Sequence, residues 1–479
     1  MKTMRTVFLS LFAVILLISS AHSQGSEDAL RLALQGPGFS ARSLSLGMAY
    51  TGIASDYSAV YSNPAGLGQI KRNEISLGLS HFSYGNTSTF MGNSTSFTNS
   101  TTDLNDLGLV YSFPTTQGSL VLAFGYGRTP IFNSGLSFKG NNPYSSMVPS
   151  LDQTLAYELY LIDSHNETLI EDSVRQEGRV LENGGINNWL ISGAVETAEN
   201  LFLGVTLNFV SGSYEYTRNY AEYDSYDKYT FSRFDTNYAF DHLNLLQKID
   251  GSISGFTARL GLLYKFNSHS RIGFNIKLPT SHTIEETYSA DGKSVFDVPD
   301  RNGYTEYTYG YAGTTKYGVT TPFNFTAGFS VGGDGVMLAS DVQYTDWTQL
   351  QFTDIEGDPT LDQYNSDFKE IFTSTFNFHV GAEVHIPQTT LRLRGGFAYL
   401  PSPYKADQSN NDQKFITGGL GVLVADALMI DVAFAHGFWE TSHVNYDLNP
   451  NFYNSDTPLS ETQEKISTNN VMATLSYRF

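Results

Sequence analysis

Histidines and carboxylates lie close together at two places near the C-terminal end of the chain. His379, Glu383 and His385 occupy positions of one parity in a stretch that alternates apolar and polar residues, and His436 precedes Glu440. A histidine base oriented by a carboxylate, beside a serine or a water molecule, is the arrangement that hydrolases use. Neither group comes with a serine in a recognisable catalytic motif. We therefore expect hydrogen-bonded structural histidines, with a hydrolase as the minor alternative.

Carboxylates also gather in two other stretches. They are Asp152, Glu158, Asp163, Glu167, Glu171, Asp172, Glu177 and Glu182, followed by Glu215, Glu222, Asp224, Asp227, Asp235 and Asp241. Divalent cations bind carboxylate oxygens, but neither stretch has the ligand spacing of a calcium-binding loop. We expect a solvated acidic surface, no metal site and no cofactor. The net charge of −20 disfavours nucleic acid as a partner, and the absence of cysteine excludes disulfides and thiol chemistry.

Fourteen segments of about ten residues, between residue 73 and the C-terminus, provide the elements that would position these side chains. They span 73–82, 104–113, 119–128, 187–197, 201–214, 255–265, 270–279, 321–330, 336–345, 376–385, 391–399, 415–423, 427–436 and 470–479. The connections alternate between about 3–5 and about 15–58 residues, as they do in bacterial outer-membrane barrels. The pattern predicts an all-β fold, a 14-stranded antiparallel transmembrane β-barrel over residues 73–479.

The alternation also predicts which side chains face lipid. In the last segment Val471, Leu475 and Phe479 fall on one face, and Met472 and Thr474 fall on the other. The apolar face must point to lipid, because an arginine at the bilayer midplane costs about 2–4 kcal/mol. The charged residues that then point into the lumen are Arg259, Arg271, Lys277, Asp341, Glu383, Arg392, Arg394, Asp431 and Arg478. A lumen of mixed charge suits either a water-filled pore or a barrel packed around a plug.

The first residues have the features of an export signal. Lys2 and Arg5 precede an apolar run, and Ala21 and Ser23 are the small residues of a cleavage site before Gln24. Residues 1–23 are therefore predicted to be a signal peptide. No later stretch approaches the 18 or more apolar residues of a spanning helix, so a membrane-inserted chain must be a barrel. The predicted location is the bacterial outer membrane.

Residues 24–72 precede the first predicted strand and are too apolar for a solvated tail. Leu30, Leu32, Leu34, Phe39, Leu44, Leu46, Met48, Tyr50 and Ile53 all need burial. The nearest place to bury them is the barrel interior, so the segment is predicted to be an N-terminal hatch inside the lumen. Phe39, Leu46, Met48 and Tyr50 are the residues we expect to contact a ligand there.

The segment contains the motif Asn63, Pro64 and Ala65, which is also ordinary turn chemistry. Preceding the first strand of a fourteen-stranded barrel, it resembles the hatch motif of the outer-membrane transporters for long-chain fatty acids and other hydrophobic compounds, the FadL/TodX family. Nearly the whole chain after residue 23 shares the resemblance. The other stretches that carry it are 41–47, 260–265 with 271–274, 341–347, and 393–399 followed by Pro403.

The resemblance implies passive uptake of a hydrophobic small molecule by a monomer, with outer-membrane lipid as the other partner. The ligand would enter a pocket above the hatch and leave sideways where the third strand kinks inward. In this chain that strand contains Gly125, Gly127 and Pro130, which allow a bend and remove a ladder donor. On the residues alone, the glycines could equally relieve crowding. Fatty acids, aromatic hydrocarbons and other apolar ligands all remain open.

The long connection 129–186 is predicted to contain a short helix across the barrel mouth. Ser150 with Gln153, and Ser164 with Glu167, have the spacing of a capping box. Leu151, Leu155 and Leu159 would form one apolar stripe, either for a ligand or for packing on a neighbouring loop. The tyrosines between residues 304 and 317 suggest strands that rise above the membrane. A family member that acts as a shuttle or scaffold in secretion, and an adhesive barrel, are the remaining alternatives.

Overall fold

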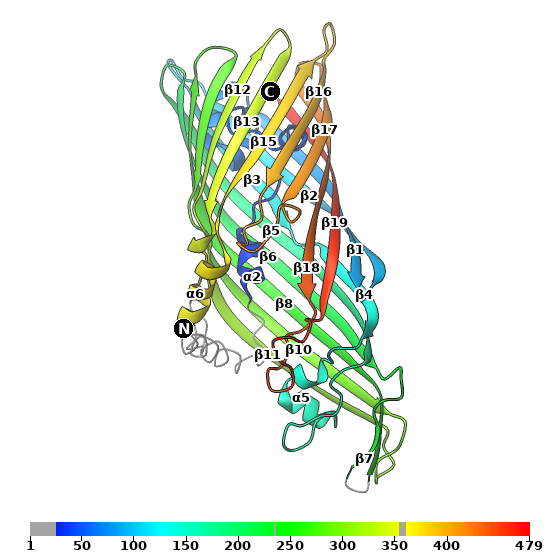
Figure 1. Ribbon diagram of the computed structural model, residues 1–479. Coiled ribbons are helices and arrows are strands. Elements are labelled where there is room, and N and C mark those ends of the chain that lie inside the picture. Colours follow the sequence, from blue (N-terminus) through cyan, green and yellow to red (C-terminus); the bar gives the residue numbers. More distant parts are fainter. Residues whose placement is uncertain (1–24, 234–235, 354–360) are drawn as a thin grey trace, which may run out of the picture.

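A computed structural model describes residues 25–233, 236–353 and 361–479, which form one closed antiparallel β-barrel (Figure 1). The described residues give fourteen wall strands, as predicted, and the first closes the barrel by pairing with the last. In chain order they are β1 (Glu74–Phe90), β2 (Asn93–Phe113), β3 with β4 (Leu120–Ile131, Ser134–Asn142), β5 (Val174–Ala198), β6 (Leu201–Tyr223), β8 (Thr236–Lys265), β9 with β10 (Ser270–Lys277, Ser281–Phe296), β11 with β12 (Glu306–Thr320, Asn324–Gly333), β13 with β14 (Val336–Asp346, Gln351–Thr353), β15 (Ser374–His385), β16 (Leu391–Leu400), β17 (Gln413–Val424), β18 (Leu428–Val444) and β19 (Glu461–Arg478). The short β7 (Thr230–Arg233) pairs with the start of β8.

Most of the predicted long connections are in fact continued strands. β1 and β2 run on to a tight turn at Met91. The strand suggested by the tyrosines of 304–317 is present, because Tyr307, Tyr309, Tyr311 and Tyr317 lie in β11, which pairs with β10, and Tyr304 precedes it. The reason for the difference is physical. Above the lipid no face of a strand is required to be apolar, so the alternation that marks a transmembrane segment stops while the ladder continues.

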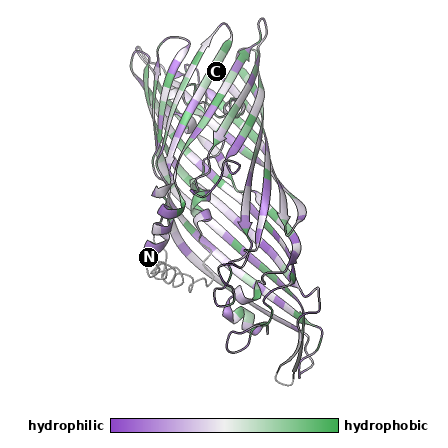
Figure 2. Ribbon diagram, viewed as in Figure 1, coloured by the Kyte–Doolittle hydropathy of each residue, from purple (hydrophilic) through white to green (hydrophobic). Residues whose placement is uncertain are grey.

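The predicted lipid-facing register is confirmed where the alternation is clearest. In β19 Val471 is 44% exposed and its neighbour Met472 is 1% exposed. In β18 Val432 points outward and Asp431 is buried in the lumen. Figure 2 shows apolar residues on the wall near the C-terminus and more hydrophilic residues toward the end with the long connections. No helix in the described part of the chain is long and apolar enough to span a membrane.

The connection between β4 and β5 contains one of the two predicted helical turns. η3 (Val148–Ser150) is followed by α5 (Gln153–Glu158), but the N-cap is Asp152 and not Ser150. Asp152 Oδ1 accepts hydrogen bonds from two backbone nitrogens of α5, so a carboxylate does what we assigned to the serine. No helix forms after Ser164, and Asp163 closes that loop as a turn.

The apolar side of α5 packs into the loops. Leu155 and Leu159 are buried among the aromatic side chains of the barrel mouth, which include Phe138 and Tyr220. The stripe therefore stabilises the loop structure. At the opposite side of the mouth, η4 (Trp347–Gln349) and α6 (Leu361–Ile371) form a second cluster around Phe368.

Residues 25–72 fold inside the cylinder, where Figure 1 shows them as the blue segment. They form α2 (Ser26–Ala33), α3 (Ala41–Ser45), α4 (Ala59–Ser62) and the 3₁₀ helix η2 (Pro64–Gln69). Ser40 caps α3 through its hydroxyl, which accepts from the Ser43 backbone nitrogen at 3.1 Å. The helices are short, so contacts with the wall, and not helix propensity, must hold this segment. The predicted signal sequence lies outside the described residues.

Candidate functional site

The motif at residues 63–65 ties the N-terminal segment to the wall. The Asn63 side-chain amide donates to the backbone oxygens of Thr51 (2.9 Å) and Leu262 (3.1 Å), and its Oδ1 accepts from Ala65 N (3.2 Å). Pro64 begins η2, where its missing N–H is not needed. Asn63 thus makes the turn that its sequence allows and also links the segment to β8.

Glycines of the wall face this segment all around the barrel. They are Gly108, Gly125, Gly127, Gly204, Gly261, Gly273, Gly328, Gly381, Gly396 and Gly419, and we call them the glycine belt. A Cβ on Gly396 would lie 2.2 Å from the backbone nitrogen of Gly47, and one on Gly381 would lie 2.3 Å from Leu46 O. Only glycine permits such an approach of two backbones. The segment is therefore in direct contact with the wall on most sides.

Lumenal charges hold the same segment through ion pairs. Arg42 of α3 pairs with Glu383 at 3.1 Å, and Arg394 bridges Glu383 (2.7 Å) and Asp431 (2.6 Å). Asp341 Oδ2 accepts hydrogen bonds from the backbone nitrogens of residues 50 and 51. Glu383 and Asp341 thus bind residues 25–72, which we call the plug, and Arg394 joins Glu383 to Asp431 within the wall.

The histidines singled out above have structural partners. His379 Nδ1 lies 2.9 Å from the backbone oxygen of Gly47, and His436 Nδ1 lies 3.0 Å from Asn469 Oδ1. His385 contacts the backbone oxygen of Thr389 at the end with the short turns. In the described part of the chain, no three histidine, aspartate or glutamate side chains lie close enough together to hold a metal ion.

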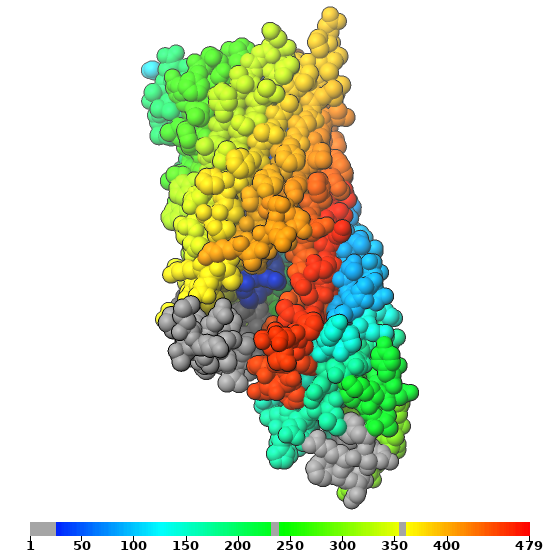
Figure 3. Space-filling view, in the orientation of Figure 1, coloured from blue at the N-terminus to red at the C-terminus, as the bar shows by residue number. Residues whose placement is uncertain are grey.

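A pocket of about 400 Å³ lies in the lumen above the plug. Leu30, Ala33 and Leu34, at and just after α2, give it an apolar side, and Arg259 and Lys277 stand on the wall. Figure 3 shows α2 in dark blue at the bottom of a hollow between the yellow to orange and the red parts of the chain. The pocket is therefore reached from the end with the long connections.

Of the four residues predicted to contact a ligand, only Met48 lines this pocket. Phe39, Leu46 and Tyr50 are fully buried between the plug and the wall, where they pack with residues of β2 and β3. Of the three, Phe39 packs against the glycine belt at Gly127, and Tyr50 donates a hydrogen bond to Asp56 within the plug. Leu30 and Leu34 line the pocket and belong to the apolar set that was expected from the sequence to be buried. Which members of that set point into the pocket depends on how the plug folds.

The wall is interrupted at the third strand. The ladder between β2 and β3 ends at the pair Asp106 and Gly127, and β4 pairs only with β5. The free edge of β4 instead meets side chains from the inner face of β1, because Asn86 donates to Gly135 O (2.9 Å) and Ser88 to Ser137 O. The second half of the third strand, β4, thus lies inside the wall. Side chains of β1 close the gap that the missing backbone ladder leaves between β2 and β4.

Of the three residues proposed for the bend, only Pro130 lies at the bend, and Gly125 and Gly127 lie in the paired part of β3. Pro130 is at the bend itself and lines the pocket with Ile131. Gly125 and Gly127 lie below it and face Tyr57 and Phe39 of the plug, with no room for a Cβ. These two glycines therefore leave room for side chains of the plug, a role that was not predicted from the sequence.

A pair that crosses the interruption was not recognised from sequence. Arg128 Nε lies 3.3 Å from Asp103 Oδ1. By parity Arg128 belongs to the lipid-facing side of β3, where a cation is costly, and that cost is the signal that could have drawn attention to it.

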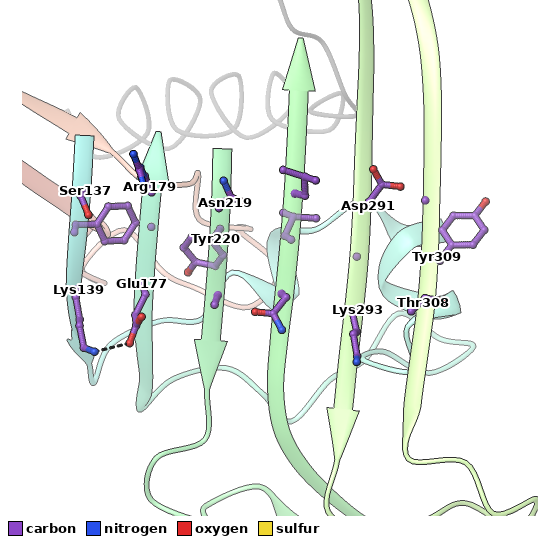
Figure 4. A pocket seen from close by; sticks show the side chains of 18 of the residues that line it. Ser137, Lys139, Glu177, Arg179, Asn219, Tyr220, Asp291, Lys293, Thr308 and Tyr309 are labelled. Atoms are coloured by element: carbon purple, nitrogen blue, oxygen red, sulfur yellow. Dashed lines mark ion pairs between the residues drawn. The ribbon is translucent and has the colours of Figure 1, made fainter. Parts of the chain in front are cut away.

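A second hollow, of about 790 Å³, lies on the outer face of the wall above the lipid-facing band (Figure 4). Its lysines have carboxylate partners, since Lys139 pairs with Glu177 and Lys293 with Glu306, each at 2.8 Å. The sheet separates this hollow from the lumen, so it is no part of the route through the barrel.

A closed 14-stranded barrel with an apolar outer band and an occupied lumen is the architecture of a bacterial outer-membrane protein. The family described as outer membrane protein transport protein (OMPP1/FadL/TodX) matches residues 186–479. The chain belongs to this family, whose members are transport proteins and not enzymes. A search of curated proteins found no match.

Several solved structures share the fold. A Pseudomonas aeruginosa FadL homologue is 12% identical with a TM-score of 0.58, over 93% of this chain and all of that one. The P. putida toluene transporter TodX is 14% identical with a TM-score of 0.55 (92% and 99% covered). The Ralstonia pickettii toluene transporter TbuX is 17% identical with a TM-score of 0.51 (92% and 99% covered).

Proposed function

We propose that this chain carries hydrophobic small molecules, and long-chain fatty acids in particular, passively across the outer membrane and releases them sideways into lipid. The observation that supports this most is the position of the pocket. It lies above a plug that touches the wall all around, and it reaches the interrupted wall at Pro130 and Ile131. An apolar molecule leaves water readily for a bilayer, so a side exit is the favourable route.

The carboxylates that line the pocket, Asp341, Asp407 and Glu440, all accept hydrogen bonds from the chain itself, so the cations are the charges left for a ligand and favour an anionic head group. Arg259 and Lys277 are buried on the wall, and neither forms an ion pair with a described residue. Arg259 stacks on the ring of Tyr61 at 4.3 Å and leaves its Nε without a hydrogen-bond acceptor. A carboxylate on an otherwise apolar ligand would satisfy these cations, because buried charges require partners.

Residues 24–72 act as the hatch in this proposal, and residues 1–23 as the signal that exports the chain. The pocket, the hatch and the interrupted wall all come from one chain, so a monomer is sufficient. Outer-membrane lipid receives the ligand. Uptake of radiolabelled oleate by cells that express the chain, against cells with an empty vector, tests this function directly. Equal uptake by the expressing and the empty-vector cells would contradict the proposed transport function.

Replacing Lys277 by methionine is expected to weaken oleate binding about tenfold or more. A hydrogen bond to a charged group contributes about 1.5–3 kcal/mol, and methionine keeps the length of the side chain but not its charge. Binding of a neutral alkane of equal length should change little. Calorimetry in detergent with both ligands measures the difference, and Lys293→Met in the outer hollow is the matched control. Equal losses for oleate and alkane would show that the cation does not recognise a carboxylate.

A further inference from the structure

Asp103 and Arg128 meet from opposite faces of the wall. Asp103 has the inward parity of β2, whereas Arg128 has the outward parity of β3, and yet Arg128 Nε is 3.3 Å from Asp103 Oδ1. Two side chains of one flat sheet with opposite parities cannot meet in this way. They meet because the end of β3 has moved behind β2, so that its outer face looks at the inner face of β2. The pair therefore lies between two layers of the wall.

Around the pair, neutral side chains of β1 and β2 join the two sides, and Asn86 and Ser88 of β1 donate hydrogen bonds to β4. Below the pair, the backbone ladder ends at Asp106 and Gly127. Above it, Asn99 donates to the backbone oxygens of Ser134 (3.2 Å) and Glu182 (3.0 Å). Among the described residues, Arg128 and Asp103 form the one ion pair that joins β2 to β3, and both side chains are about one-fifth exposed.

Each partner is also held on its own side of the interruption. Arg128 Nη1 donates to Asn187 Oδ1 of β5 at 3.0 Å, and Asp103 Oδ2 accepts from the Thr101 hydroxyl at 2.9 Å. The contact between the two layers can therefore open without either side chain losing all of its partners. That is the property expected of a contact that breaks and reforms.

We propose that the Asp103–Arg128 ion pair is a latch on the side exit. The proposal rests on the proposed lateral release. It states that this ion pair is the barrier that a ligand must open on its way from the pocket to the lipid. An apolar ligand that passes between the layers must separate the pair. Neutralising either partner lowers that resistance, and linking the partners covalently closes the exit.

Charge variants test the latch. Asp103→Asn and Arg128→Gln are each expected to raise the initial rate of oleate uptake two- to fivefold, which corresponds to about 0.4–1 kcal/mol. The double variant should be no faster than the single ones, because the pair is already broken, and the reversed pair Asp103→Arg with Arg128→Asp should return the rate toward that of the unmodified chain. Glu285→Gln is the control, since Glu285 pairs with Lys316 across a fully laddered part of the wall away from the pocket.

A covalent link separates the latch from the exit itself. The chain has no cysteine, so Asp103→Cys with Arg128→Cys, joined by a cleavable bifunctional thiol reagent, is a clean modification. We expect uptake to stop and to return after cleavage, while the same treatment of Glu285→Cys with Lys316→Cys has no effect. Uptake that continues through the linked protein would overturn both the latch and lateral release. A link that stops uptake, together with charge variants that leave the rate unchanged or slow it, would overturn the latch and leave lateral release standing.

Discussion

Replacing Gly396 by alanine is expected to lower the free energy of unfolding by about 2–3 kcal/mol and to loosen the plug. A Cβ at this position would lie 2.2 Å from Gly47 N and 2.4 Å from Leu46 C, and both are backbone atoms that cannot rotate away. Overpacking of this kind typically costs about 1–3 kcal/mol. Gly47 itself has φ +65° and would bring a Cβ to within 2.6 Å of Phe397 N, so neither side can yield.

The neighbouring Gly395 provides a matched control. It points away from the plug, and a Cβ there would have Thr417 O at 3.8 Å as its nearest neighbour. Gly395→Ala should stay within about 0.5 kcal/mol of the unmodified chain. Urea unfolding of both variants in lipid vesicles gives the two free energies, and planar-bilayer conductance reports a loosened plug. Equal stability of the two variants would mean that the glycine belt does not seat the plug.

Replacing Arg394 by methionine is expected to destabilise the protein by about 3–5 kcal/mol. The Arg394 side chain is fully buried and bridges Glu383 and Asp431, and it is the only ion-pair partner of Asp431 among the described residues. Removing one member of a buried ion pair leaves a charge without compensation, which is the costly case. Urea unfolding in vesicles measures the loss.

Two further variants identify its cause. Adding Asp431→Leu to Arg394→Met removes the isolated carboxylate and should recover part of the lost stability. Lys316→Met breaks the exposed pair with Glu285 and should cost less than about 1 kcal/mol. If Arg394→Met behaved like Lys316→Met, the lumenal charges would not be holding the structure together.

The barrel was predictable because lipid imposes a period of two on every strand that crosses it. The last strand shows this best, since the apolar side chains of Val471, Leu475 and Phe479 all lie exposed on the outer face, where lipid is the environment that suits them. The plug was predictable for a similar reason, as a run of apolar residues with no strand pattern had to be buried somewhere. Above the membrane this constraint ends, and apart from the near-alternating tyrosines of β11 the strand extensions at the mouth left no comparable pattern.

The direction of residues within the plug was not predictable in the same way. Phe39 and Met48 are both apolar, but one packs on Gly127 of the wall and the other lines the pocket, and only the path of the backbone decides between them. The role of the wall glycines was hidden as well, because a glycine gives no sign of what approaches it. The pairing of Arg128 with Asp103 was not recognised, since alternation assumes that neighbouring strands lie in one layer.

The central claim is that ligands leave through the side of the barrel while the plug stays in place. Locking the plug to the wall tests it most directly, and Ala41→Cys with Thr474→Cys suits this purpose. Ala41 N lies 3.0 Å from Thr474 Oγ1, which brings the two residues within reach of a disulfide in a chain without other cysteines. We predict that oleate uptake is the same with the disulfide formed and with it reduced. Uptake that disappears on oxidation and returns on reduction would show that the plug must move, and would contradict lateral release.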